Sequence, residues 1–218
     1  METRRNLLCP DVPKWSNDSP IIELINVSKS FGDKQVIENL SLSIFAGKST
    51  VISGQSGTGK SVLLKMMNGL ILPDEGVVKL FGRNLLEIDE RQRTELRKRC
   101  TMVFQNYALI DSMTVRENVG FSLAQNTDLK TAAIDALIID ILEMLELGHT
   151  LDQMPAALSG GMKKRVALAR AVITNPEVVL FDEPTTGLDP IMIEFVDGLI
   201  EKTQKAFGLT SVIVRSLR

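Results

Sequence analysis

The chain has 218 residues, and 44% of them are hydrophobic, which is ordinary for one globular α/β domain with a full core. Its 25 basic and 27 acidic residues give a net charge of −2, so no bulk positive field attracts nucleic acid or anionic lipid. No apolar run approaches the roughly 18–20 residues that span a bilayer, and residues 1–20 lack the apolar stretch of a signal peptide, so we expect a cytoplasmic chain without a nucleic-acid partner.

Residues 1–20 predict a poorly ordered leader before a single domain that covers residues 21–218. The leader combines Arg4, Arg5, three prolines and Trp15 without periodicity. Trp15 is its one large aromatic residue and could dock on a neighbouring surface.

The domain opens with three strands, a glycine-rich loop and a helix. Alternating apolar residues indicate strands at 23–27 and 41–45, and a short β-rich run covers 49–53. A helix is expected over 60–68 and closes at Gly69. The loop between the third strand and the helix reads Gly54-Gln55-Ser56-Gly57-Thr58-Gly59-Lys60-Ser61.

This loop is a complete Walker A pattern in the strand–loop–helix context that the pattern requires. Its glycines let consecutive N–H groups converge on phosphate oxygens, and the helix N-terminus adds partial positive charge. We expect Lys60 to contact the β- and γ-phosphates and Ser61 to bind Mg²⁺. The alternative is a glycine-rich turn that binds nothing, and the eight-residue match disfavours it.

A second anion site is indicated by Leu158-Ser159-Gly160-Gly161-Met162. The strong helix formers at 163–171 make the paired glycines the opening of a helix, where N–H groups are exposed. The basic residues at 163–165 are better explained as a solvated helix face than as a nucleic-acid site.

Two carboxylates follow a strand of the type that is buried on both faces of a parallel sheet. The run Val178-Val-Leu-Phe181 is continuously apolar, and Asp182 and Glu183 emerge from its end. Adjacent carboxylates at the tip of a hydrophobic strand are costly unless a cation or a reacting water uses them. We assign Asp182 to the magnesium shell and Glu183 to orienting or deprotonating the attacking water.

Together the three motifs resemble the ATP-binding cassette (ABC) family, and the resemblance covers about residues 21–214. It implies an α/β fold of the P-loop NTPase class and ABC ATPase type: a mostly parallel core sheet flanked by helices, an antiparallel β edge and an inserted helical subdomain at about 84–160. The amphipathic stretch at 129–147 fits that subdomain. The cofactors implied are ATP and Mg²⁺, and the preference for ATP over GTP rests on the resemblance alone.

The resemblance also implies roles for residues outside the Walker motifs. Phe31 would stack on adenine, although strand packing is the alternative. Gln105, after an apolar strand at 101–104, would reach magnesium and the lytic water from a loop that also faces the membrane partner. The family forms a head-to-tail homodimer with two ATP molecules between the protomers. In it, the γ-phosphate held by one protomer would be contacted by the signature motif of the other, here Ser159, Gly160 and Gly161. Asp189, in the segment 185–190 that matches the family's D-loop, would lie near the dimer seam.

One branch of the family is the most similar. The segments 59–65, 104–115, 159–166 and 188–192 look like the ATPase of Mla/Mce-type lipid transporters, with Val62 and Met162 as the most telling residues. This implies a subunit on the inner face of the plasma membrane that drives phospholipid movement through a permease and an Mce-type lipid-binding protein. An importer of another substrate remains an alternative, and a soluble cassette ATPase of translation or DNA repair is disfavoured by the single cassette.

The chain departs from the family after its expected last strand at 210–214. The relatives continue with Thr-His-Asp, whereas Arg215, Ser216 and Leu217 stand here. We therefore expect the switch histidine and the family's C-terminal part to be missing, and turnover to be slow. The competing hypothesis is a truncated, non-hydrolysing nucleotide-binding remnant or regulatory subunit.

Overall fold

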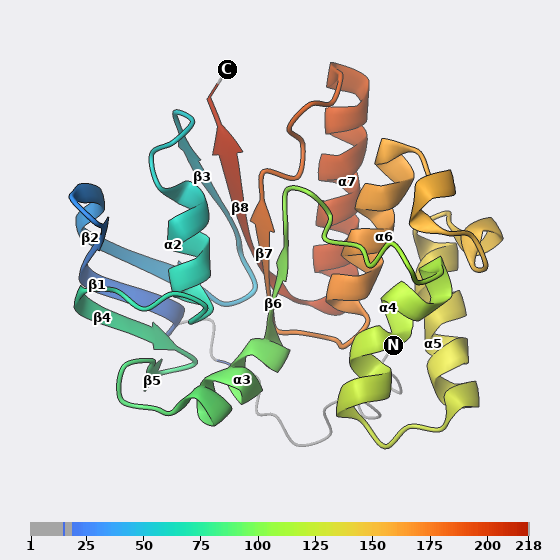
Figure 1. The fold of residues 1–218 in the computed structure, drawn as a ribbon, viewed down its shortest axis with the longest axis horizontal. Helices are drawn as coiled ribbons and strands as arrows, with labels where there is room; N and C mark the ends of the chain where they lie inside the picture. Colours follow the sequence, from blue (N-terminus) through green and yellow to red (C-terminus); the bar gives the residue numbers. More distant parts are fainter. Residues whose placement is uncertain (1–14, 16–18, 218) are drawn as a thin grey trace.

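Two four-stranded sheets form the framework of the computed structural model, which describes residue 15 and residues 19–217 (Figure 1). The first sheet is antiparallel and has the order β2-β1-β4-β5. Its strands are β1 (Pro20–Phe31), β2 (Lys34–Phe45), β4 (Glu75–Leu80) and β5 (Arg83–Asn84).

The second sheet is parallel and has the order β3-β8-β7-β6. Its strands are β3 (Ser49–Gly54), β6 (Cys100–Val103), β7 (Val178–Asp182) and β8 (Thr210–Ser216). All of β7 is buried, as expected for an inner strand of a parallel sheet. The carboxyl ends of β3, β7 and β8 therefore meet at one edge.

The helices lie on both sides of the parallel sheet. In Figure 1, α2 lies between the two sheets, whereas α6 and α7 lie on the opposite side of the parallel sheet, with α4 and α5 beyond them. The helices are α2 (Lys60–Met67), α3 (Glu90–Arg99), α4 (Val115–Asn126), α5 (Thr131–Met144), α6 (Gly160–Val172) and α7 (Pro190–Phe207), with short 3₁₀ turns at Gly148–Thr150 and Pro155–Ala157.

Alternate residues of the parallel strands enter two different hydrophobic cores. Val178 and Leu180 of β7 face the core that contains α2 and the antiparallel sheet. Val179 and Phe181 face the core that contains α4, α5, α6 and α7. Because successive side chains of a strand point to opposite faces, one apolar run supplies both cores.

The predicted fold class is confirmed: the chain is mixed α/β, with a parallel core sheet and an antiparallel one. The strands expected at 23–27 and 41–45 are parts of longer strands, β1 and β2, because both continue past the alternating segment. Helix α7 and strand β4 were not predicted. Within 84–160, β6 belongs to the parallel sheet, and α4 and α5 pack on each other.

Trp15 docks on the domain. Its ring meets Phe81 edge-on at 6.2 Å between centroids, and its indole N–H donates to the Ser19 carbonyl at 3.0 Å. The other residues of the predicted leader before Ser19 lie outside the described residues. Over the described part of the chain, no helix is both long and apolar enough to cross a bilayer.

Candidate nucleotide site

The glycine-rich loop joins the end of β3 to the first turn of α2. Gly57 and Gly59 have φ angles of +80° and +89°, a region that favours glycine. Gly59 is the N-cap of α2 and no side chain caps this end, so its first N–H groups face the loop without a side-chain acceptor. This is the arrangement that binds phosphate oxygens at a helix N-terminus.

Lys60 is buried, with its ammonium inside the loop. The Nζ atom donates to the carbonyl oxygens of Gly54 at 3.1 Å and Gln55 at 2.7 Å. It also lies 3.3 Å from Ser216 Oγ and 3.8 Å from Glu183 Oε1. The loop therefore holds a positive charge where the Walker A pattern predicts the phosphates to bind.

Ser61 and Asp182 form a pair of oxygen donors at the end of β7. The Ser61 hydroxyl donates to Asp182 Oδ1 at 2.8 Å, and the Asp182 residue is only 6% exposed. A hydroxyl and a carboxylate oxygen are of the type that Mg²⁺ takes alongside substrate phosphates. Across the described part of the chain no cluster of three or more His, Cys, Asp or Glu residues could hold a metal by itself, so this pair fits a metal that shares its shell with a nucleotide.

Glu183 directly follows β7 and has a φ angle of +49°, which is rare for a non-glycine residue. One carboxylate oxygen accepts a hydrogen bond from Ser216 and the other accepts one from Thr186 at 2.6 Å. These bonds, that of Ser216 first, hold the pKa of Glu183 below its ordinary value of 4.5, and nearby Lys60 acts in the same direction. Glu183 is thus an oriented and ionised carboxylate.

The paired glycines open α6, as the sequence predicts. Ser159 is the N-cap, and its hydroxyl accepts from the Met162 N–H at 3.3 Å. Asp189 is the N-cap of α7 and accepts from the Met192 N–H at 3.0 Å. The two helix starts are neighbours, because a Cβ on Gly161 would lie 3.0 Å from Met192 Cε.

Phe31 and Gln105 make no described contact with Lys60, Ser61, Asp182 or Glu183. Phe31 ends β1 with 49% of its surface exposed, and the ammonium of Lys29 lies 5.5 Å from its ring centroid. Gln105 is exposed just after β6. Among the described contacts, none joins Gln105 to Ser61 or Asp182.

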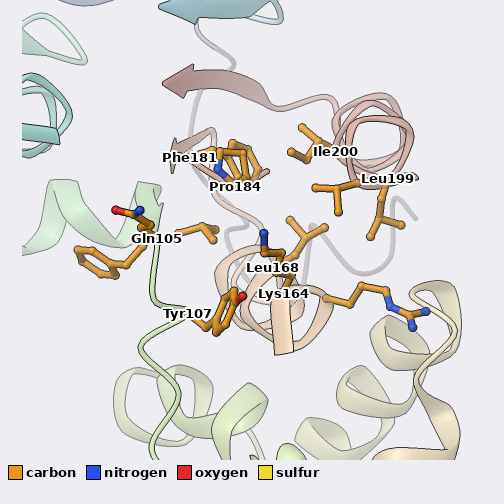
Figure 2. A pocket seen from close by; sticks show the side chains of 12 residues that line it. Gln105, Tyr107, Lys164, Leu168, Phe181, Pro184, Leu199 and Ile200 are labelled. Carbon is orange, nitrogen blue, oxygen red and sulfur yellow. The ribbon is translucent and has the colours of Figure 1, made fainter. Parts of the chain in front are cut away.

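A small, mainly apolar cavity lies between the parallel sheet and the helices α6 and α7 (Figure 2). Lys164 and Leu168 of α6 face it together with Phe181 and Leu199, and Gln105 lies at its edge. Burial lowers the pKa of Lys164, whose ammonium donates to the Thr186 carbonyl at 3.3 Å. The segment after β6 and the turn after β7 therefore line the same cavity.

The fold brings Lys60 and Ser61 of the glycine-rich loop together with Asp182 and Glu183, which lie about 120 residues later in the chain. It adds two hydroxyls that the sequence reasoning gave no role, those of Thr186 and Ser216. Thr186 sits three residues after Glu183, a spacing that permits a local turn contact, whereas the contact of Ser216 depends on the pairing of β7 with β8.

Comparison with known proteins gives one consistent family. Residues 37–186 match the family described as "ABC transporter". The chain is 38% identical over 194 residues to the intermembrane phospholipid transport system ATP-binding protein MlaF of Haemophilus influenzae, covering 89% of this chain and 74% of that protein. It is 36% identical to the probable ribonucleotide transport ATP-binding protein mkl of Mycobacterium leprae, covering 88% of this chain but only 56% of that protein.

Solved structures agree. The ATP-binding cassette MJ0796, in a dimeric post-hydrolysis state bound to ADP and Pi, has a TM-score of 0.81 and 32% sequence identity to this chain. The match covers 89% of this chain and 87% of that structure.

Proposed function

Since this chain belongs to the ABC transporter family, we propose that it is an ATP-hydrolysing subunit that powers phospholipid transport, and that Lys60, Ser61, Asp182 and Glu183 form its reaction site. The observation that carries the proposal is the meeting of Lys60 with Glu183, and of Ser61 with Asp182, at one edge of the parallel sheet. This constellation supplies the positive charge, the metal-type oxygens and the base that phosphoryl transfer to water requires.

The chemistry assigns each residue one task. Lys60 and the N–H groups of the loop 54–61 neutralise the charge of the β- and γ-phosphates. Glu183 takes a proton from water as the water oxygen bonds to the γ-phosphorus. The bond from that phosphorus to the β–γ bridging oxygen breaks, and its electron pair leaves with ADP.

Mg²⁺ would be held by Ser61 and Asp182, with Gln105 reaching it once nucleotide is bound. When bound, the ion supplies positive charge along the phosphates. Phe31 is proposed as the platform for the adenine ring, because it is exposed at the end of β1, next to the hairpin that continues to Val36. Val36 in turn touches the loop, since a Cβ on Gly59 would lie 2.7 Å from its Cγ1.

We further propose a homodimer in which the start of α6 in one protomer completes the site of the other. Within one chain, Ser159, Gly160 and Gly161 make no described contact with Lys60 or Glu183. Two solved cassette structures similar to this chain are dimeric, which supports a dimer here. Asp189 would lie near the seam, since α7 begins beside α6.

The cargo is proposed to be phospholipid, moved through an integral-membrane permease and an Mce-type protein, with this chain peripheral on the inner face of the plasma membrane. The similarity to the MlaF protein supports this choice. Because another relative is named for ribonucleotide transport, the cargo needs an experiment of its own.

The hydrolysis step is tested by ATP turnover of the purified chain beside Glu183→Gln and Lys60→Ala. We expect phosphate release by the chain, nucleotide binding without release by Glu183→Gln, and weakened binding by Lys60→Ala. Equal phosphate release by the chain and Glu183→Gln would contradict the proposal.

The cargo is tested on the chain captured from membranes with its permease and reconstituted in vesicles. ATP-dependent transfer of a fluorescent phospholipid, absent with Glu183→Gln, is the expected result. Uptake of a labelled ribonucleotide without lipid transfer would replace the lipid proposal and leave the ATPase assignment intact.

A further inference from the structure

The carboxylate of Glu183 is fixed from more directions than a surface glutamate requires. Ser216 donates to one of its oxygens and Thr186 donates to the other. Its backbone N–H donates to the Val214 carbonyl at 3.1 Å, and its side chain is only 14% exposed. A residue with a φ of +49° stays in that conformation only where its surroundings determine it this strongly.

Ser216 stands between the lysine and the glutamate of the site. Its hydroxyl donates to Glu183 Oε1 and lies 3.3 Å from Lys60 Nζ, which has no acceptor capacity and must be the donor. The direct distance from Lys60 Nζ to the same Glu183 oxygen is longer, 3.8 Å. One neutral hydroxyl therefore uses its donor and an acceptor site to bridge two charged groups.

The end of β8 is well placed to hold this hydroxyl in position. Asp182 of β7 lies opposite Val214 of β8 in the parallel register, so Ser216 extends past the end of β7, next to Glu183. The following Leu217 N–H donates to the Gly54 carbonyl at 3.0 Å, which ties the end of β8 to the glycine-rich loop. Thr186, the second hydroxyl, is held through its own carbonyl by Lys164.

We propose that Ser216 is a positioning residue for ATP hydrolysis in this chain: its hydroxyl orients the Glu183 carboxylate toward the attacking water and keeps the Lys60 ammonium separated from it. The inference rests on the proposed function, and Thr186 secures the opposite oxygen. Ser216 transfers no proton in this scheme, because the water proton goes to Glu183. Without Ser216, Glu183 would turn toward Lys60 and lose the orientation that general-base catalysis needs.

The test compares Ser216→Ala and Ser216→Thr with the unchanged chain by kcat and by the KM for ATP. Ser216→Ala should lower kcat about tenfold and leave the KM for ATP within about twofold. Ser216→Thr keeps a hydroxyl and should recover most of kcat. Ser211→Ala is the matched control, because that buried serine of β8 bonds to Ser49 at 2.7 Å, outside the site.

A second measurement does not depend on turnover. The ¹³C carboxyl chemical shift of Glu183, assigned by its loss in Glu183→Gln, reports the hydrogen bonds of this carboxylate at one neutral pH. We expect this chemical shift to change in Ser216→Ala and to stay in place in Ser216→Thr and Ser211→Ala. An unmoved chemical shift together with an unchanged kcat in Ser216→Ala would overturn the inference, whereas absence of turnover in the unchanged chain would count against the proposed function alone.

Discussion

The guanidinium of Arg170 in α6 donates a hydrogen bond of 2.9 Å to the backbone carbonyl of Tyr107, 63 residues earlier in the chain. The same group donates to the Ala108 carbonyl at 2.6 Å. Tyr107 and Ala108 both have positive φ angles, 60° and 49°, so a single side chain secures two strained residues. Arg170 therefore connects the helix that starts at Gly160 with the segment that follows Gln105.

Arg170→Lys should destabilise the protein and weaken this connection. A single ammonium cannot reproduce the planar fork that serves both carbonyls, and we expect a loss of about 2 kcal/mol in the free energy of unfolding. The measurement is urea denaturation followed by circular dichroism. Arg91→Lys, at an exposed position of α3, is the control and should leave the unfolding midpoint unchanged. An equal midpoint for both variants would show that the two bonds contribute little.

Asp182→Asn should separate stability from activity. The Asp182 carboxylate is buried, and Ser61 is the side chain that donates to it among the described contacts. A buried charge with so few partners is costly, so we expect the free energy of unfolding of the nucleotide-free variant to rise by about 1 kcal/mol. It should nevertheless lose the magnesium dependence of ATP binding. Calorimetric titration with ATP, with and without magnesium, checks the second effect, and thermal melting checks the first.

Asp189 has a structural task that must be separated from its proposed place at the dimer seam. As the N-cap of α7 it accepts the Met192 N–H, so Asp189→Ala should cost about 1 kcal/mol of stability. Asp189→Ser keeps a capping oxygen and should retain that stability while losing the carboxylate. If Asp189 lies at the seam, both substitutions should weaken ATP-dependent dimerisation in a Glu183→Gln background, measured by sedimentation velocity. If Asp189→Ala weakens dimerisation and Asp189→Ser does not, Asp189 acts only as the cap of α7.

The elements that the sequence predicted best are those in which one local pattern determines the outcome. The Walker A octapeptide fixes the loop before α2, and the apolar run 178–181 fixes β7. Helix α7 was missed although its ends are marked, by Asp189 with Pro190 at its start and by Gly208 at its end. Its buried residues, Val196, Ile200 and Thr203, also recur at the helical spacing of four and three residues, so the pattern that predicts this helix was present in the sequence.

The contacts of Ser216 could not be predicted in the same way. They depend on the register that sets Asp182 opposite Val214, and on a residue, Glu183, whose backbone is left-handed. Neither property leaves a trace in the local sequence, because strand pairing across 33 residues is decided by the packing of both cores. The sequence therefore identifies the reactive groups, and the register of the sheet determines which hydroxyls hold them.

The stability of the protein should depend on pH through Glu183. Hydrogen bonds from Ser216 and Thr186 lower the pKa of its folded carboxyl below the ordinary 4.5. Such a group contributes stability that is fully present above the unfolded pKa and is lost as the pH falls through the folded pKa. In thermal melts from about pH 3 to pH 7, the difference in melting temperature between the unchanged chain and Glu183→Gln should therefore decrease toward the acid end. A difference that is constant with pH would contradict this.

Two helical glycines offer a test of packing with opposite expected signs. A Cβ on Gly120 of α4 would lie 2.7 Å from Cδ1 of Ile138, a buried residue of α5, whereas a Cβ on Gly198 of α7 would meet no atom within 4 Å. Gly198→Ala should stabilise the protein by about 0.5–1 kcal/mol, because alanine loses less conformational entropy in a helix.

Gly120→Ala gains the same helix propensity, but the buried side chain of Ile138 must shift or α5 must move away from α4, which costs about 1–3 kcal/mol in a packed core. We therefore expect its midpoint in urea to fall while that of Gly198→Ala rises. Since the substitution is identical in both helices, the difference between the two variants isolates the contact between α4 and α5. Midpoints that rise together would mean that the Ile138 side chain or α5 can give way at little cost.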